Sequence, residues 1–235
     1  MSLYDLAKPF LFVFSPERAH SLAITALKLG VLPSAEKIHS GVLAQNLWGL
    51  HFPNPIGLAA GFDKNAEVYA PMLKQGFGFV ETGTVTPLPQ PGNEKPRIFR
   101  LKQDQAVINR LGFNNEGLEY YIKQLKKRVK EDGIVGANID YFTINISSPN
   151  TPGLRALQGK DALDELLSKL KSVRDGIGAK EKPPLLLKIA PDLDERECED
   201  IAEVIVNHEM DGLIVSNTTL SREGLTSPFK DEGGG

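Results

Sequence analysis

Short apolar runs alternate with amphipathic segments through most of this 235-residue chain, and that alternation limits the folds it can adopt. Strands separated by helices pair in parallel, because each crossover returns the chain to the same end of the sheet. The sequence therefore predicts an α/β fold, either doubly wound or a closed (β/α)8 barrel. The predicted strands are 55–60, 79–86, 134–139, 141–147, 185–190 and 212–217, and the predicted helices between them are 65–76, 115–128, 162–176 and 194–209.

Two features depart from a complete eight-stranded barrel. Strands 134–139 and 141–147 almost touch in sequence, although parallel neighbours need a crossover of about a dozen or more residues. After the last recognisable strand, a full barrel would need about two more units before the chain ended. We therefore expect that an internal segment near Asn138–Asp140 and the C-terminal strands are absent from the chain.

The composition excludes several classes of function. Lysine and arginine number 27 against 30 acidic residues, a net charge of −3 without a dense basic patch, which does not support nucleic-acid binding. The single cysteine, Cys198, cannot form an internal disulfide, as is typical of a reducing compartment. The 4 histidines lack metal-ligand spacing, so no metal site is predicted. The motifs GxxxxGK(S/T), GxGxxG and GxSxG are also absent from the expected places.

The first 30 residues form a pattern of their own. Apolar side chains recur there at helical spacing, at Leu3, Leu6, Ala7, Phe10 and Phe14. A second helix is expected to start with Ser15 as N-cap and Pro16 in its first turn and to end at Gly30. The interrupted apolar run is shorter than the roughly 20 residues that span a bilayer. The pattern permits helices that cap a core or a helical pair that lies on a membrane surface.

Small or polar residues follow nearly every predicted strand at its carboxyl end. They are Ala60, Gly61, Asp63, Lys64, Thr84, Asn138, Asn145 to Ser148, Lys188 and Ser216 to Thr218. The carboxyl ends of barrel strands meet on one face, where active sites are built. Amides there suit the edge of a planar heterocycle, and lysines favour an anionic ligand. Helix capping is the alternative for single residues, and we favour it for Asp194 and Asn115.

Several runs resemble the quinone-dependent, membrane-associated (class 2) dihydroorotate dehydrogenase family. They are NPIGLAAGFDKN (54–65), ETGTVTPLPQPGNEKPRIFRL (81–101), INRLGFNNEG (108–117), NISSPNTPGLR (145–155), LLKIAPDL (186–193) and VSNTTLSR (215–222). Together they are specific and extend over almost the whole chain. The resemblance implies a TIM barrel with an N-terminal helical hairpin. Residues 1–30 would be a membrane-associating helical pair that forms a quinone tunnel, and residues 31–235 would be the FMN-binding barrel, incomplete as described above.

The resemblance also implies the site residues. FMN would be bound by Ala60, Gly61, Lys64, Thr84, Asn138, Asn145, Lys188 and Ser216, where Ser216 replaces the threonine of many relatives but keeps a hydroxyl. Dihydroorotate or orotate would be bound by Lys64, Asn109, Arg110, Leu111, Gly112, Phe113, Asn145, Asn150, Asn217 and Thr218. Ser148 would be the catalytic base that takes the C5 proton while hydride leaves C6 for flavin N5. Ser147, on the opposite face of the strand, is interpreted as structural. His20 and Arg100 match residues that contact quinone in relatives.

The function expected from the resemblance is oxidation of (S)-dihydroorotate to orotate in de novo pyrimidine biosynthesis, with FMN as hydride acceptor and a membrane quinone as final electron acceptor. We expect peripheral association with the cytoplasmic face of a bacterial inner membrane, or with the mitochondrial inner membrane in a eukaryote, and no obligate protein partner. One alternative is a Schiff-base lyase or aldolase on the same barrel, with Lys188 as nucleophile. Another is a truncated barrel that survives as a membrane-surface binding protein.

Overall fold

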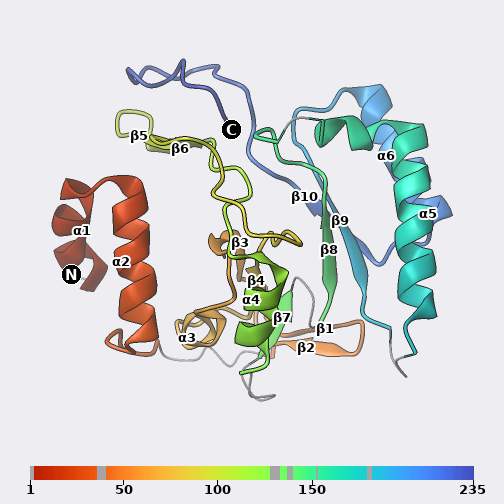
Figure 1. Cartoon of the computed structure of the whole chain (residues 1–235), viewed down its shortest axis with the longest axis horizontal. Helices are drawn as coiled ribbons and strands as arrows, with labels where there is room; N and C mark the ends of the chain where they lie inside the picture. The colour runs from red at the N-terminus through yellow and green to blue at the C-terminus, as the bar shows by residue number, and fades with distance from the viewer. Residues whose placement is uncertain (1–2, 36–40, 128–132, 137–139, 152, 179–181) are drawn as a thin grey trace. The chain divides into compact units, whose positions relative to one another are not determined.

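The computed structural model describes residues 3–35, 41–127, 133–136, 140–151, 153–178 and 182–235 (Figure 1). The chain divides into two compact units, and each is described here by itself. Unit 1 comprises Met1–Val135 and Thr226–Lys230, and unit 2 comprises Gly136–Leu225 and Asp231–Gly235. This division follows contacts within the chain, so the functional boundary predicted after residue 30 stays a prediction.

Unit 1 begins with a helical pair and continues into a parallel sheet with two added hairpins. Its helices are α1 (Leu3–Val13), α2 (Pro16–Lys28), α3 (Tyr69–Leu73) and α4 (Gly117–Leu125). Its strands are β1 (Gln45–Leu47), β2 (Leu50–Phe52), β3 (Gly57–Asp63), β4 (Phe79–Thr82), β5 (Ile98–Leu101), β6 (Ala106–Asn109) and β7 (Ile134–Gly136), whose last residue passes the unit boundary. The sheet order is β3-β4-β7, with β3 and β4 parallel. The pairs β1–β2 and β5–β6 are antiparallel.

The predicted N-terminal helical pair is present. Pro16 occupies the first turn of α2, and Gly30 has a φ of +66° directly after the C-cap Leu29, so the chain leaves the helix where the sequence predicts. Ser15 stands at the N-cap position, but its side chain makes no capping hydrogen bond. Within the described ranges, each helix is too short or too polar to cross a bilayer.

Unit 2 is a three-stranded parallel sheet packed against two long helices. Its elements are β8 (Phe142–Asn145), the 3-10 helix η2 (Arg155–Gln158), α5 (Lys160–Gly176), β9 (Leu185–Ile189), α6 (Glu195–Asn207) and β10 (Gly212–Val215). The sheet order is β10-β9-β8, and both neighbouring pairs are parallel. Figure 1 shows α5 and α6 beside this sheet. The core of the unit consists of Ile146, Leu163, Leu167, Leu187, Ile189, Ile201 and Val204.

The alternation of side chains along β8 positions the polar residues. Ile144 and Ile146 pack with the core formed with α5 and α6. Because successive side chains on a strand point to opposite faces, Asn145 lies on the face turned away from those helices. Lys188 is its register partner on β9 and shares that face. This strand therefore has an apolar face toward the helices and a polar face away from them.

Some predicted elements differ from the observed ones. The expected helix 65–76 is reduced to the five residues of α3, because the Asp63 carboxylate accepts hydrogen bonds from the backbone N–H groups of Glu67 (2.7 Å) and Val68 (2.8 Å) and holds them in a turn. The expected strand 79–86 ends at Thr82, where Gly83 has a φ of +95°. The hairpins β1–β2 and β5–β6 were not predicted.

One short stretch of the C-terminal region belongs to unit 1. Asp104, in the turn between β5 and β6, accepts hydrogen bonds from the backbone N–H of Thr226 at 2.9 Å, from its hydroxyl at 2.8 Å and from the N–H of Ser227 at 2.9 Å. The ring of Phe229 lies 5.7 Å from that of Phe99. Thr226–Lys230 is therefore fixed to the β5–β6 hairpin by both polar and aromatic contacts.

Candidate active site

Four predicted ligand-binding residues of unit 2 lie at or near the carboxyl ends of neighbouring strands. Asn145 ends β8 and pairs in register with Lys188 on β9. Asn217 follows β10, and its backbone N–H donates to the carbonyl of Ile189 at 3.0 Å. Ser216 lies between β10 and Asn217, with its hydroxyl on the Asn217 carbonyl at 3.0 Å. The structure thus brings together the amide and ammonium groups that the sequence placed at separate strand ends.

Ser147 connects two of these amides. It is fully buried, and its Oγ donates to Oδ1 of Asn145 at 2.8 Å while accepting from Nδ2 of Asn217 at 2.9 Å. With both hydrogen bonds made, neither side-chain amide can rotate freely. Ser147 therefore holds Asn145 and Asn217 in place across β9, a role more specific than the structural one that the sequence suggested.

Arg155 supports the same region from η2. Its guanidinium donates to the carbonyl of Ser147 at 3.3 Å, to a carboxylate oxygen of Asp192 at 3.1 Å and to the carbonyl of Thr218 at 3.4 Å. Asp192 also accepts from the Thr219 hydroxyl and from the Leu220 N–H. Sequence reasoning singled out neither charge. Both lie inside runs that carried the family resemblance, and a charged residue within such a run is the signal that could have identified them.

Ser148, the predicted base, is also well buried. Only 8% of its surface is exposed, and its Oγ accepts a long hydrogen bond of 3.3 Å from the backbone N–H of Asn150. Thr218 is positioned by Asn217, whose Oδ1 accepts from the Thr218 N–H at 2.8 Å. The hydroxyl of Ser148 therefore lies in the same unit as Asn145, Asn150, Asn217 and Thr218, the predicted substrate-binding residues of unit 2.

Lys188 is a buried cation with no protein partner in the part of the chain that the structure describes. Its residue surface is 8% exposed, and none of the described residues forms a hydrogen bond or ion pair with its ammonium. Such a position fits a bound group with electron-rich carbonyl oxygens or negative charge, as the resemblance to FMN-binding proteins implies.

In unit 1, the structure brings Lys64 to the predicted substrate stretch 109–113. Lys64 directly follows β3, and its Nζ donates to the carbonyl of Gly112 at 3.3 Å. Burial and, to a smaller extent, the positive charge of Arg97 lower the pKa of Lys64 to about 8, against the opposing effect of Glu17. Lys64 is therefore still mostly protonated at neutral pH but titrates close to it.

Ala60 and Gly61 lie within β3, and Thr84 follows the adjacent strand β4 in unit 1. The N–H of Gly61 donates to the carbonyl of Gly83 at 2.9 Å, and the N–H of Gly83 donates to the carbonyl of Asp63 at 3.0 Å. Gly61 has a φ of +110°, and no described atom lies within 4 Å of the place where a Cβ would stand. The backbone here is open to the close approach of a flat ligand.

Arg110 and the two predicted quinone residues make contacts within unit 1. The Arg110 guanidinium lies 4.7 Å from the centre of the Phe99 ring and donates to the carbonyl of Pro96 at 3.0 Å. Arg100 donates to the carbonyl of Phe14 at 2.9 Å. His20 donates from Nε2 to the carbonyl of Phe62 at 2.8 Å. His20 and Arg100 thus connect the helical pair to β3 and β5, and their contact with quinone stays a prediction.

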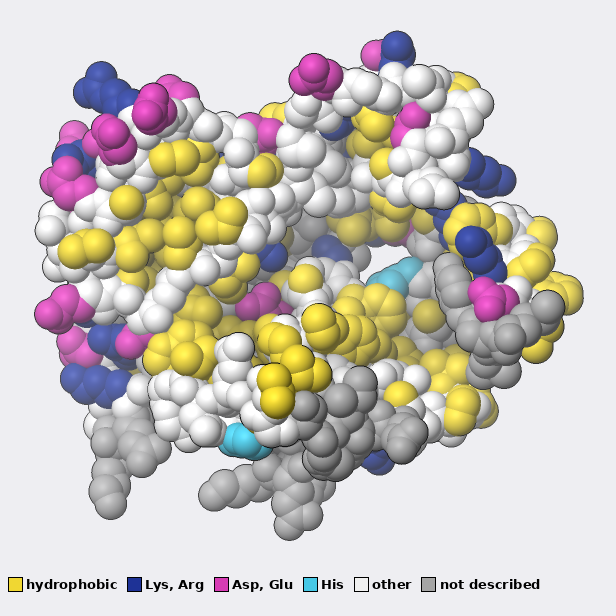
Figure 2. Space-filling view, turned by 180° about the vertical axis from the view of Figure 1, so that it is seen from behind, with side chains coloured by type: hydrophobic (Ala, Val, Ile, Leu, Met, Phe, Trp, Pro, Cys, Tyr) yellow, Lys and Arg dark blue, Asp and Glu magenta, His cyan; other side chains and the backbone are white. Residues whose placement is uncertain are grey.

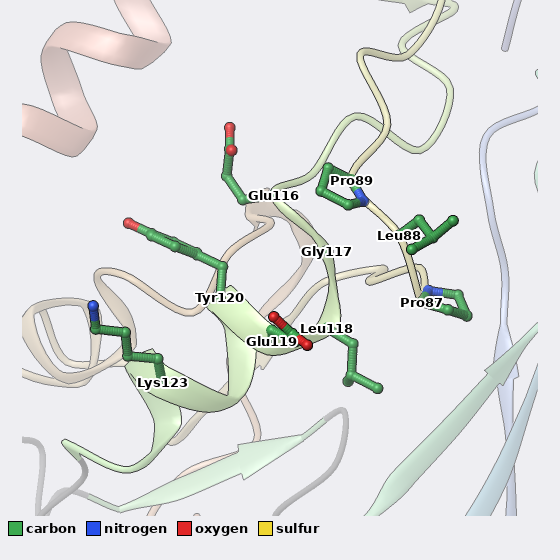
Figure 3. Close-up of a pocket in the computed structure, with 9 residues that line it drawn as sticks. All are labelled: Pro87, Leu88, Pro89, Glu116, Gly117, Leu118, Glu119, Tyr120 and Lys123. Carbon is green, nitrogen blue, oxygen red and sulfur yellow. The ribbon is translucent and has the colours of Figure 1, made fainter.

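Two further features complete the survey. Asn138, a predicted FMN ligand, lies outside the described residues. Among those described, no cluster of histidine, cysteine and acidic residues could hold a metal ion. A hollow of about 520 Å³ opens beside the start of α4 (Figure 3), lined by Pro87, Leu88, Pro89, Glu116, Gly117, Leu118, Glu119, Tyr120 and Lys123. It contains no predicted site residue and is not the candidate active site.

Comparison with known proteins identifies the family. The sequence model described as dihydroorotate dehydrogenase matches residues 42–139 and 133–235. Two curated relatives carry the name dihydroorotate dehydrogenase (quinone). The one from Chelativorans sp. (strain BNC1) is 51% identical over 98% of this chain and 70% of its own length. The one from Parvibaculum lavamentivorans is also 51% identical, over 97% of this chain and 71% of its own length. This chain belongs to the dihydroorotate dehydrogenase family.

Solved structures of dihydroorotate dehydrogenase agree with the fold. The ligand-free DHODH from Eimeria tenella is 40% identical, with a TM-score of 0.87 over 94% of this chain and 74% of the other. The complex of that protein with ferulenol gives a TM-score of 0.86. The predicted fold class, a partial TIM barrel preceded by helices, and the predicted family are confirmed.

The comparisons also bear on the internal gap expected in this chain. The family match is broken into two pieces that meet at residues 133–139. The alignment with the Chelativorans relative runs over 256 positions, more than the 235 residues of this chain, so the relative has residues with no counterpart here. The divided family match agrees with a missing segment near Asn138–Asp140, where the sequence predicted one.

Proposed function

We propose that this member of the dihydroorotate dehydrogenase family oxidises (S)-dihydroorotate to orotate in de novo pyrimidine biosynthesis, with FMN as hydride acceptor and a quinone as final electron acceptor. The observation that carries the proposal is the set of strand ends in unit 2. Asn145 and Lys188 are in register, Ser147 joins Asn145 to Asn217, and Ser148 is buried next to that bridge. Amides around an ammonium suit a planar, electron-rich ring system.

The residues present fit FMN in two respects. Lys188 is largely buried on the same face as Asn145, and Gly61 presents open backbone. We infer that FMN would be held by Ala60, Gly61, Lys64, Thr84, Asn138, Asn145, Lys188 and Ser216. When bound, FMN supplies the acceptor for the hydride. The protein supplies orientation, positive charge and exclusion of water.

The chemical role of the chain is to remove a proton while hydride leaves the substrate. We propose that Ser148 takes the C5 proton. A serine hydroxyl is a weak base, so it needs neighbours that stabilise the developing negative charge of the substrate. Lys64, protonated at neutral pH, and the asparagine amides supply such groups. The proposed substrate ligands are Lys64, Asn109, Arg110, Leu111, Gly112, Phe113, Asn145, Asn150, Asn217 and Thr218.

We further propose that residues 1–30 form the quinone-binding and membrane-associating part, distinct from a barrel part of residues 31–235. Phe10 is 73% exposed on α1 and Val13 is 82% exposed. Figure 2 shows hydrophobic side chains on the flank that these helices form, at the right of that view. Exposed apolar side chains on a helical pair suit the surface of a bilayer. His20 and Arg100 are the proposed quinone contacts, and the proposed location is peripheral, at the inner membrane.

The test begins with flavin content. The protein, purified and incubated with FMN, should become yellow, and dihydroorotate should bleach the flavin absorbance under anaerobic conditions until a quinone restores it. Failure to bind FMN at saturating concentration would contradict the proposal. Borohydride reduction in the presence of a carbonyl substrate should leave Lys188 unmodified, whereas trapping at Lys188 would favour the Schiff-base alternative.

The membrane proposal has its own test. Phe10→Ser with Val13→Ser should weaken binding to liposomes and leave flavin reduction unchanged, because both side chains are exposed and their loss does not open the core. Unchanged liposome binding in that double variant would remove α1 from the role.

A further inference from the structure

Arg97 is a buried arginine whose guanidinium is almost completely enclosed by acceptors. Its residue surface is 5% exposed. Nε and one terminal nitrogen donate to the same carboxylate oxygen of Glu17, at 2.9 and 2.8 Å. The other terminal nitrogen donates to the carbonyls of Pro91 at 2.7 Å and Asn93 at 2.9 Å. A buried charge requires such a partner, so the Glu17 carboxylate of α2 offsets the cost of burying the Arg97 guanidinium just before β5.

The same guanidinium reaches the loop that carries the Lys64 acceptor. Arg97 makes a long hydrogen bond of 3.5 Å to the carbonyl of Leu111, and Lys64 donates to the next carbonyl, that of Gly112, at 3.3 Å. The backbone N–H of Arg110 donates to the carbonyl of Arg97 at 2.8 Å. Two cations thus hold consecutive peptide groups of one loop, and a shift of Arg97 would move the acceptor of Lys64.

Helix α2 makes a second contact near Lys64. His20 lies one turn after Glu17 and donates to the carbonyl of Phe62 at 2.8 Å, with its ring edge-on to the Phe62 ring at 5.1 Å. Phe62 lies on β3, two residues before Lys64, which directly follows that strand. The helix is therefore fixed to the end of β3 as well as to β5.

The charges of the pair act on Lys64 in opposite senses. Burial lowers the pKa of Lys64 most, the positive charge of Arg97 lowers it further, and the negative charge of Glu17 raises it. The protonation of Lys64 near neutral pH therefore depends on the balance between Glu17 and Arg97.

We propose that the Glu17–Arg97 pair positions Lys64, fixing the loop against which its ammonium rests and balancing the charge around it. Through this pair, α2 influences substrate binding although it carries no proposed substrate ligand. The inference rests on the proposed function only in taking Lys64 as a ligand of the substrate. Neither Glu17 nor Arg97 is expected to touch the substrate, so both are positioning residues.

The direct test measures Lys64 without substrate or flavin. The rate at which acetic anhydride labels Lys64 is followed against pH by mass spectrometry of peptides. Glu17→Gln should move the titration of Lys64 to lower pH and Arg97→Met should move it to higher pH, each by about half a unit or more. Lys95→Met is the matched control, because Lys95 also lies near Glu17, at 3.7 Å, but is largely exposed. It should leave the titration in place.

A variant that keeps the negative charge at position 17 tests whether the pair positions Lys64 or only stabilises the fold. Glu17→Asp should return the Lys64 titration most of the way to its original pH, and it serves as the decisive variant if Arg97→Met does not fold. Unmoved titration in Glu17→Gln, or a shift in the same direction in both single variants, would overturn the proposal. If the pair only stabilised the fold, both variants would lower the thermal stability, and the Lys64 titration would not shift in opposite directions.

Turnover supplies a separate readout. In Glu17→Gln, the KM for dihydroorotate should rise about threefold or more at pH 8 while kcat at saturation changes little, since a positioning residue acts on binding. If opposite labelling shifts appear in a protein that does not oxidise dihydroorotate, the proposed function fails and the positioning role stands. If turnover is present but the labelling shifts are absent, the positioning role fails alone.

Discussion

Lys64 and Lys188 occupy comparable places at the ends of parallel strands, yet their surroundings differ. Lys188 lies within β9, in register with Asn145 and Ile214, and its neighbours are fixed by the pairing of the sheet. Lys64 follows β3, and its surroundings come from Glu17, Arg97 and Gly112, which are far from it in sequence. The position of Lys188 follows from the local strand pattern and the pairing of the strands. The charges around Lys64 come together only when the chain has folded.

The two regions also differ in chemistry. In unit 2, neutral hydroxyl and amide groups bind one another around a cation that has no described partner. In unit 1, the Lys64 ammonium donates to a backbone carbonyl, and two opposite charges act on its pKa. We expect mutations in unit 2 to act on catalysis and on cofactor binding, and mutations around Lys64 to act on pH dependence and substrate affinity.

The largest expected effect separates the two adjacent serines of unit 2. Ser148→Ala should slow anaerobic flavin reduction by about 100-fold or more, because a positioned base is lost. Ser147→Ala keeps the base but removes the bridge between Asn145 and Asn217, so its rate should fall by about tenfold or less. Stopped-flow absorbance measures both. Equal losses in the two variants would mean that Ser148 has no special role in proton removal.

Mutations of the two lysines should have different effects on cofactor binding and on substrate binding. Lys188→Met should weaken FMN binding by about 10- to 100-fold, the range expected for a lost charge-assisted hydrogen bond. Lys64→Met should weaken dihydroorotate binding by a similar factor, with a smaller effect on FMN. Fluorescence titration of FMN and the KM for dihydroorotate provide the comparison. The reverse pattern would exchange the roles assigned to the two residues.

The pH dependence of the unfolding free energy should test the lowered pKa of Lys64. Its pKa is about 8 in the folded chain against 10.5 ordinarily, so between these values the unfolded state binds more protons. The cost of burying the charge is therefore complete below pH 8 and fades as the pH rises toward 10.5. Lys64→Met should raise the unfolding free energy by about 1–3 kcal/mol at pH 7, with a smaller gain at pH 10. Urea denaturation at both pH values measures this, and a gain that grows with pH would contradict it.

The smallest expected effect lies at the start of α6, away from either lysine. Asp194 accepts from the Glu197 N–H at 2.8 Å, and Glu197 accepts from the Asp194 N–H at 2.9 Å. Asp194→Ala should lower the unfolding free energy by about 1 kcal/mol, and Asp194→Asn should lower it less because Asn still caps. Flavin reduction should stay the same in both variants. A change in its rate would show that α6 takes part in the site.

The sequence predicted those parts of the fold that depend on local pattern. The strands of unit 2 and the cap at Asp194 follow from alternation and from residue preferences near helix ends. The hairpins β1–β2 and β5–β6 escaped prediction, because strands of three or four residues carry too little periodicity. The helix expected over 65–76 was overlong because the hydrogen bonds of the Asp63 side chain cannot be read from spacing.

The candidate site was predictable to a different extent. Family resemblance provided the individual residues, and parallel register then accounts for the pairing of Asn145 with Lys188. No pattern joins Glu17 to Arg97, because 80 residues separate them and the contact exists only after folding. The bridging role of Ser147 was missed for a related reason. Its partner Asn217 lies 70 residues away on the far side of β9.

The stretch Thr226–Lys230 has a practical consequence for exchanging parts between relatives. It belongs with Met1–Val135, although the residues on both sides of it belong to the other unit. In a chimera joined at a single point after Val135, Asp104 and Phe99 would pack against residues 226–230 of the other parent. Swapping the amino-terminal part of this protein therefore calls for two grafts, one long and one of five residues.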